Sequence, residues 1–187
     1  MSKPEHTQLA HANETHSLDF FSPSSDVLGS VLSSMNGRKL GFVTCDVNHA
    51  QNAGEICRLL ANFAPPGSVL RHVISDGEVK QNNSPKTPMI KQGKFLKVSC
   101  GTHRNIEHVC STTSEFCDWV LTGTDRPPLV VIETARGAKN IHEFAFPPSC
   151  EIMVGGETMG VNKDILDCLV DGYDSIVYIP MPGFCKS

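Results

Sequence analysis

The stretch CEIMVGGETMGVN, residues 150–162, decides the fold class of this chain. Its first half is mostly apolar and lacks the strict polar alternation of a strand with one wet face, and two glycines end the run. Short, mostly apolar runs are typical of strands that are covered on both faces, as in parallel sheets. The stretch therefore predicts a buried parallel strand that ends in a glycine-rich loop.

Five further runs of the same kind lie along the chain. They are LGFVTC (40–45), SVLRHVI (68–74), KFLKVSC (94–100), PLVVIET (128–134) and DSIVYIP (174–180). A helix is predicted over 54–63, where apolar residues recur at helical spacing (Ile56, Leu59, Leu60 and Phe63), and another around 105–121, which carries Trp119. Apolar strands that alternate with helices predict an α/β fold, a parallel sheet flanked by helices on both faces.

The N-terminus and one internal stretch depart from this pattern. Residues 1–17 are polar without periodicity, so we expect them to be disordered, and they lack the apolar core of a secretory signal. Residues 27–35 show one apolar helical face, and 75–93 form a polar insertion that we expect to be mobile. We therefore divide the chain into an N-terminal tail and helix, 1–38, and one domain, 39–187.

Composition limits the functional classes. The 187 residues carry a formal net charge of -4, which gives no overall basic surface for nucleic acid. No apolar run is long enough to span a membrane. The eight cysteines contain no C-x-x-C pair, which argues against zinc ribbons and favours reduced thiols in an intracellular protein. Cys100, His103, His108 and Cys110 match no common zinc spacing, so we predict no metal.

The loop GGETMGVN, residues 155–162, has some features of a phosphate-binding loop. Gly155 and Gly160 have the required spacing, but Val161 and Asn162 stand where that loop needs lysine and a hydroxyl residue, and Glu157 would repel phosphate. The spacing of a dinucleotide-binding loop fails as well. Two interpretations stay open: the glycines let the backbone approach a ligand that is not a polyphosphate, or they only permit a tight turn.

A second motif follows the strand at 40–45. Asn52, Gly54 and Arg58 form N-x-G-x-x-x-R at the mouth of the predicted helix. Ligands of parallel sheets bind at the carboxyl ends of the strands, so Arg58 is a candidate for the site. The alternative is an ordinary surface arginine.

Three motifs in order resemble those of the SpoU/TrmH branch of the SPOUT methyltransferases. They are N-x-G-x-x-x-R, G-x-E-x-x-G in the glycine loop, and I-P-M followed by a glycine and a serine, over residues 40–187. The resemblance implies that 39–187 is a SpoU-type methyltransferase domain with a trefoil knot, a rare exception among folds. It further implies S-adenosylmethionine as cofactor and 2′-O-methylation of ribose in tRNA or rRNA.

The resemblance also implies roles for single residues. Arg58, Asn52, Glu157 and Ser187 match the catalytic positions, and Thr134, Gly155, Gly160, Ile179 and Met181 match the walls of the cofactor pocket. Because an arginine keeps its proton at any ordinary pH, Arg58 is better suited to clamp a phosphate and stabilise a developing alkoxide than to act as a base. We expect these catalytic residues to converge at the carboxyl ends of the strands.

The third motif of the family continues past its first serine, which Ser187 matches. We therefore expect the knotted segment and a dimerisation helix to lie beyond this chain, the complete protein to be a homodimer, and the chain as printed to be inactive. A relative that binds RNA or a partner without catalysis remains an alternative, as does another kind of nucleotide-binding α/β domain. We expect a cytoplasmic location, with nucleus and organelles left open.

Overall fold

The computed structural model describes residues 38–63, 67–76 and 91–181, which belong to one compact unit, Arg38–Ser187. Several sequence predictions fall outside the described residues. These are the helix at 27–35, most of the insertion at 75–93, Ser187 and the segment assigned to the knot.

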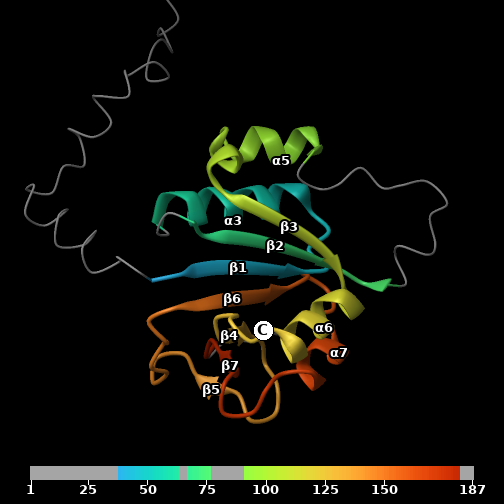
Figure 1. Cartoon of the computed structure of the whole chain (residues 1–187). Coiled ribbons are helices and arrows are strands. Elements are labelled where there is room, and N and C mark those ends of the chain that lie inside the picture. The colour runs from blue at the N-terminus through green and yellow to red at the C-terminus, as the bar shows by residue number, and fades with distance from the viewer. Residues whose placement is uncertain (1–37, 64–66, 77–90, 182–187) are drawn as a thin grey trace, which may run out of the picture. The chain divides into compact units, whose positions relative to one another are not determined.

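The sheet has seven parallel strands in the order β3-β2-β1-β6-β4-β7-β5 (Figure 1). The strands are β1 (Leu40–Cys45), β2 (Val69–Ile74), β3 (Glu107–Thr112), β4 (Leu129–Ile132), β5 (Lys139–Asn140), β6 (Cys150–Gly155) and β7 (Ser175–Tyr178). The inner strand β1 pairs with β2 on one side and with β6 on the other. The predicted α/β class with a parallel sheet is confirmed.

Helices cover both faces of the sheet. They are α3 (Ala50–Phe63), α5 (Gly93–Val98), the 3-10 helix η2 (Thr102–Asn105), α6 (Thr113–Thr122) and α7 (Lys163–Asp167). Phe42 and Leu70 pack under α3 and α5, whereas Val43 and Val73 pack under α6 and α7. This follows from the alternation of side chains along a strand, which sends neighbouring residues to opposite faces.

The segment 94–112 was predicted wrongly. KFLKVSC is the helix α5, in which only Phe95 is buried, and the strand is β3, where a helix was expected to begin. β3 lies at the edge of the sheet and has no fully buried residue, so it lacks the apolar run that marks the inner strands. A capping box then starts α6: Thr112 Oγ1 accepts from the Glu115 amide, and Glu115 Oε2 accepts from the Thr112 amide.

Helix α3 begins at Ala50 and not at residue 54, and its buried face also differs from the prediction. The residues that it buries are Ala50, Ala53, Gly54, Cys57 and Leu60. Leu59 and Phe63, expected in the core, are 48% and 68% exposed. Small residues face inward because α5 lies directly against them: a Cβ on Gly54 would sit 3.0 Å from the carbonyl oxygen of Phe95. Close helix packing, not the largest apolar side chains, sets the face of α3.

In the part of the chain that the structure describes, no helix combines the length and apolar character needed to cross a membrane. Within 38–63, 67–76 and 91–181, no three or more histidine, cysteine or carboxylate side chains gather as metal ligands would.

Candidate functional site

Two loops meet at the carboxyl edge of the sheet. One follows β1 and leads into α3, and the other follows β6 and leads into α7. Because β1 and β6 are neighbours, with Cys45 opposite Gly155, the loops leave the sheet side by side (Figure 1). In open parallel sheets this edge is where ligands bind.

The loop after β6 closes on itself through its glycines. Gly156 and Gly160 exchange two backbone hydrogen bonds, of 3.2 and 3.0 Å between nitrogen and oxygen. A Cβ on Gly155 would lie 2.1 Å from the Gly160 carbonyl carbon, and one on Gly156 would lie 2.4 Å from the Asp46 carbonyl oxygen. Gly160 itself has a φ of 68°, which disfavours other residues. The glycines therefore form a tight turn, and this turn is pinned against the loop after β1.

Glu133, which the sequence analysis did not single out, holds this loop from the other side. Its Oε2 accepts a 2.8 Å hydrogen bond from the Val161 amide, and its Oε1 accepts one of 2.8 Å from the Thr134 amide. A Cβ on Gly160 would lie 2.3 Å from Glu133 Oε2, so the third glycine makes room for this carboxylate. The available signal was a single carboxylate at the end of the apolar run PLVVI.

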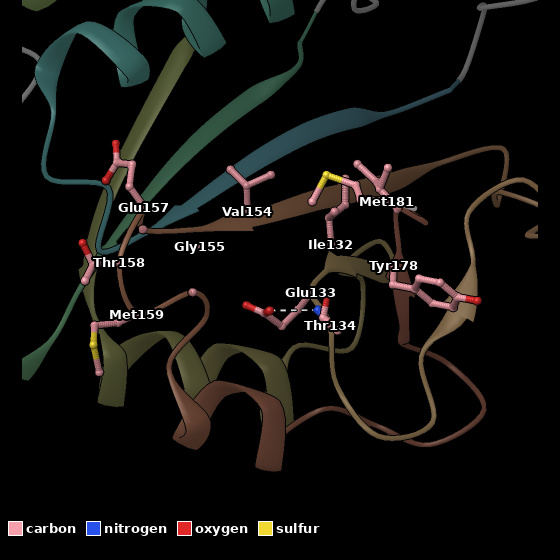
Figure 2. Close-up of a pocket in the computed structure, with 13 residues that line it drawn as sticks. Ile132, Glu133, Thr134, Val154, Gly155, Glu157, Thr158, Met159, Tyr178 and Met181 are labelled. Carbon is pink, nitrogen blue, oxygen red and sulfur yellow. Dashed lines mark hydrogen bonds between the residues drawn. The ribbon is translucent and has the colours of Figure 1, made fainter. Parts of the chain in front are cut away.

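A cavity of about 430 Å³ lies between this loop and the ends of β4 and β7 (Figure 2). The five residues expected to form a cofactor pocket all line it: Thr134, Gly155, Gly160, Ile179 and Met181. Ile132, Val154 and Tyr178 add apolar surface. The volume falls within the range of about 300–1,000 Å³ that is usual for small-ligand sites.

Carboxylates supply the formal charge of this cavity. Glu133 and Glu157 line it, and none of its described lining residues is a lysine or an arginine. Both carboxylate oxygens of Glu133 accept hydrogen bonds from backbone amides, whereas Glu157 is exposed and points toward α3 in Figure 2. Such a cavity suits a neutral or cationic ligand better than a polyphosphate.

The other side of the glycine loop forms one wall of a second cavity, of about 510 Å³, at the end of β1. Asp46 adopts a φ of 51°, and its carboxylate accepts hydrogen bonds from the amide and the hydroxyl of Ser75, at 2.7 and 2.5 Å. Asn162 completes this wall by capping α7, where its Oδ1 accepts from the Asp164 amide at 2.9 Å. One loop thus lines both cavities.

The structure brings two of the four expected catalytic residues together. Asn52 Nδ2 donates a hydrogen bond to Glu157 Oε1, which joins the first turn of α3 to the glycine loop. Arg58 is exposed on the same helix, about 9 Å farther along the axis and a third of a turn around it. It forms no hydrogen bond or ion pair with another described residue, because the early start of α3 places it in the third turn. Ser187 lies outside the described residues.

No described cysteine at this edge is prepared for covalent chemistry. Cys45 ends β1 directly below the loops, and burial raises the pKa of its thiol to about 11. It therefore stays protonated at neutral pH, when a nucleophilic cysteine would need to be a thiolate.

Solved structures with the same fold are RNA-modifying enzymes. One, from a study of 2-OH methylation of C/U34 on tRNA, is 20% identical with a TM-score of 0.59, over 80% of this chain and 85% of that one. The AdoMet-bound rRNA methyltransferase of Sinorhizobium meliloti is 15% identical with a TM-score of 0.60, over 84% and 53%. The SpoU methyltransferase AviRb of Streptomyces viridochromogenes, in complex with AdoMet, is 20% identical with a TM-score of 0.57, over 83% and 54%.

These identities are low, so the likeness establishes the fold. The chain covers most of the first of these structures and about half the length of the other two. A search of curated proteins found no match. The sequence itself matches one family model over residues 39–187, which is most of the chain and includes both loops of the site. The chain therefore belongs to the SpoU rRNA Methylase family.

Proposed function

We propose that this protein transfers a methyl group from S-adenosylmethionine to a ribose 2′-hydroxyl of tRNA or rRNA. The observation that carries the proposal is the cavity beside the glycine loop, which combines backbone walls, apolar side chains and carboxylates without a basic side chain among its described residues. A sulfonium cofactor is cationic and has a flat, partly apolar adenosine, and this cavity suits both features. Family membership and the AdoMet complexes of two structural neighbours support the same cofactor.

The chain's own groups would hold the cofactor mainly through the backbone. The loop at 155–160, together with Thr134 and Ile179 just beyond β4 and β7, forms the cavity wall that would contact the cofactor. Tyr178 and Ile132 provide apolar contact surface. S-adenosylmethionine supplies the electrophilic methyl group, so the protein has to orient the acceptor hydroxyl and exclude competing water.

Asn52 and Glu157 would orient the acceptor. Their hydrogen bond joins the wall of the cofactor cavity to α3, so a ribose bound there would meet both groups at the cavity mouth. Arg58 would act on the RNA side, as a clamp on a phosphate, because its guanidinium is always charged and reaches outward from α3. We further propose that a second copy of the protein completes the site, and that the enzyme works in the cytoplasm.

One observation favours a second candidate function, binding of RNA without catalysis. Arg58 lies apart from the Asn52–Glu157 pair and contacts no described residue by hydrogen bond or ion pair. Without a conformational change or a partner that brings Arg58 to the acceptor hydroxyl, the site has no positive charge to stabilise the transition state. The two candidates differ in methyl transfer and agree in RNA binding.

The test is transfer of a tritiated methyl group from the cofactor to tRNA and rRNA, followed by nucleoside analysis for 2′-O-methylated products. It is run with the 187-residue chain and with any further residues that its gene encodes. Arg58→Ala should lower the transfer rate about 100-fold or more, because it removes a charge that stabilises the transition state, while cofactor affinity stays within about 2-fold. The matched control is Arg38→Ala, which removes an exposed arginine just before β1, at the amino ends of the strands. RNA binding without transfer in every version would favour the second candidate.

A further inference from the structure

The basic residues of this acidic chain are unevenly distributed. Residues 91–106 hold four of its 16 lysines and arginines and none of its 20 aspartates and glutamates. In the structure this segment is α5, η2 and the turns around them. The four residues are Lys91, Lys94, Lys97 and Arg104, and all of them are exposed.

The four cations lie on the outer side of a well-anchored element. Lys94 and Lys97 lie three residues apart on α5, about 4.5 Å along its axis, and Lys91 directly precedes the N-cap residue Gln92. Phe95, on the inner side, is fully buried and packs edge-on against His72 and His108, with ring centroids 6.3 and 5.9 Å apart. The lysines are thus presented from a fixed backbone. None of the four cations pairs with another described residue across a salt bridge.

Helix α5 lies beside the helix that carries the first motif (Figure 1). The two helices approach each other closely at Gly54, whose missing side chain leaves room for Phe95 and Val98 of α5. Gly54 stands two residues after Asn52 and one turn before Arg58. The motif glycine therefore places the basic segment next to the motif's own arginine.

Acidic neighbours of this surface are few. On α3, Glu55 is exposed and accepts a hydrogen bond from Gln51 at 3.2 Å. Glu107 is exposed at the start of β3. The cations outnumber these carboxylates, so the surface retains a positive potential within a chain of net charge -4.

We propose that Lys91, Lys94, Lys97 and Arg104, here called the α5 strip, bind the phosphate backbone of the RNA substrate beside the nucleotide that is methylated. The inference rests on the proposed function, because it takes the partner to be RNA. Lysine ammonium groups on an exposed helix contact phosphates as point charges and read no base sequence. The strip would thus fix the position of the RNA, while the nucleotide is selected at the cavities.

The experiment compares two double charge reversals in the full protein. Lys94→Glu/Lys97→Glu alters the α5 strip, and Arg38→Glu/Lys39→Glu makes the same change of net charge at two exposed residues just before β1. A fluorescein-labelled, unmodified tRNA transcript and an rRNA stem–loop fragment serve as probes in anisotropy titrations at several salt concentrations. Calorimetry with S-adenosylmethionine and thermal melting accompany each variant.

The strip variant should bind RNA at least about 10-fold more weakly, with a salt slope flatter by about 1.5–2, as expected for two lost phosphate contacts. Its cofactor affinity and its kcat at saturating RNA should stay near wild type, whereas KM for RNA should rise. The control should change RNA affinity by less than about 3-fold. If charge reversal prevents folding, Lys94→Gln/Lys97→Gln should still lower the RNA affinity and the salt slope.

If both charge reversals weaken RNA binding equally, net charge alone matters, and the proposal that the α5 strip binds RNA is overturned. If the protein methylates RNA but the strip variant binds RNA as tightly as wild type, the proposed role of the α5 strip is overturned and the proposed function stands. A wild-type protein that binds cofactor but no RNA would overturn both proposals.

Discussion

On one side of β1, the strands β6, β4 and β7 fill the core with aliphatic residues, whereas on the other side β2 and β3 place histidines under α5. Val130, Val131 and Met153 are fully buried in the first half. In the second, His72 is only 3% exposed and stacks on His108 with ring centroids 5.6 Å apart. The half that carries the 430 Å³ cavity thus has a mostly aliphatic interior, whereas the half that carries the α5 strip contains stacked histidines.

The histidines form a row of polar contacts. His108 Nε2 lies 3.2 Å from the His103 carbonyl oxygen and must donate to it, because a carbonyl can only accept. His108 Nδ1 lies 3.3 Å from His72 Nε2, and His72 Nδ1 lies 3.0 Å from the Thr44 hydroxyl, which donates to the Arg71 carbonyl oxygen. Burial lowers the pKa of His72 to about 4, and burial also lowers the pKa of His108.

The aliphatic half has its own buried polar group, an ion pair at the end of the sheet opposite the site. Arg126 and Asp174 form two hydrogen bonds of 2.7 and 2.6 Å, with side chains 2% and 0% exposed. Asp174 also accepts from the amides of Leu129 and Val170. The pair therefore ties the start of β4 to the turn that leads into β7.

Of the substitutions that distinguish the two halves, one that breaks the Arg126–Asp174 ion pair should cause the largest loss of stability. Asp174→Ala leaves a buried guanidinium without its partner and should lower the free energy of unfolding by about 3–5 kcal/mol. Urea unfolding measures it. Asp167→Ala, which breaks the exposed Lys163–Asp167 pair, should leave the free energy of unfolding nearly unchanged. Similar losses in the two variants would show that the Arg126–Asp174 pair is not buried as described.

The histidine half should respond to acid. Unfolded histidine titrates near pH 6.5, whereas His72 in the fold takes up a proton only near pH 4. Between these values the unfolded chain binds more protons, so stability is full above pH 6.5 and falls as the pH drops toward 4. The loss should reach roughly 3 kcal/mol.

Urea unfolding across this pH range tests the prediction in wild type, His72→Gln and His142→Gln. The first variant should lose most of the acid-dependent slope, and the second, at an exposed histidine, should keep it. An equal slope in all three proteins would show that His72 is not the group responsible.

A smaller effect should arise where the histidine half meets the first motif. Gly54→Ala adds a Cβ 3.0 Å from the Phe95 carbonyl oxygen and 3.1 Å from the Val98 Cβ, so α5 has to shift. Overpacking outweighs the gain in helix propensity, and we expect a net loss of about 1 kcal/mol. Gly93→Ala is the control, since a Cβ there meets no atom within 4 Å. Thermal melting compares them, and a stabilising Gly54→Ala would contradict the described contact.

The sequence predicted the inner strands of both halves well, because inner parallel strands are marked by apolar runs. β1, β2, β4, β6 and β7 lie within predicted ranges. The prediction failed for β3, which is a partly exposed edge strand without an apolar run. It also failed for α5, which was assigned as a strand and buries only Phe95. The two-residue strand β5 gave no periodic signal at all.

The residues of the site also fall into two groups, those that the sequence indicated and those that it did not. Gly155, Gly160 and Thr134 were found because motif positions and strand ends are local in sequence. Glu133 was missed, since its role depends on a loop 28 residues later. The position of Arg58 relative to Glu157 depends on where α3 begins, and the stretch before Ala50 carries no strong helix-start signal.

The measurement that tests the central claim most directly is calorimetry with S-adenosylmethionine and with its demethylated product. Wild type and Gly93→Ala should bind both ligands one to one. Gly155→Ala should bind at least about 10-fold more weakly, a loss of about 1.4 kcal/mol, because its Cβ would lie 2.1 Å from the Gly160 backbone and forces the cavity wall to move. No binding heat with either ligand in wild type, or equal affinity in Gly155→Ala, would contradict the assignment of this cavity to the cofactor.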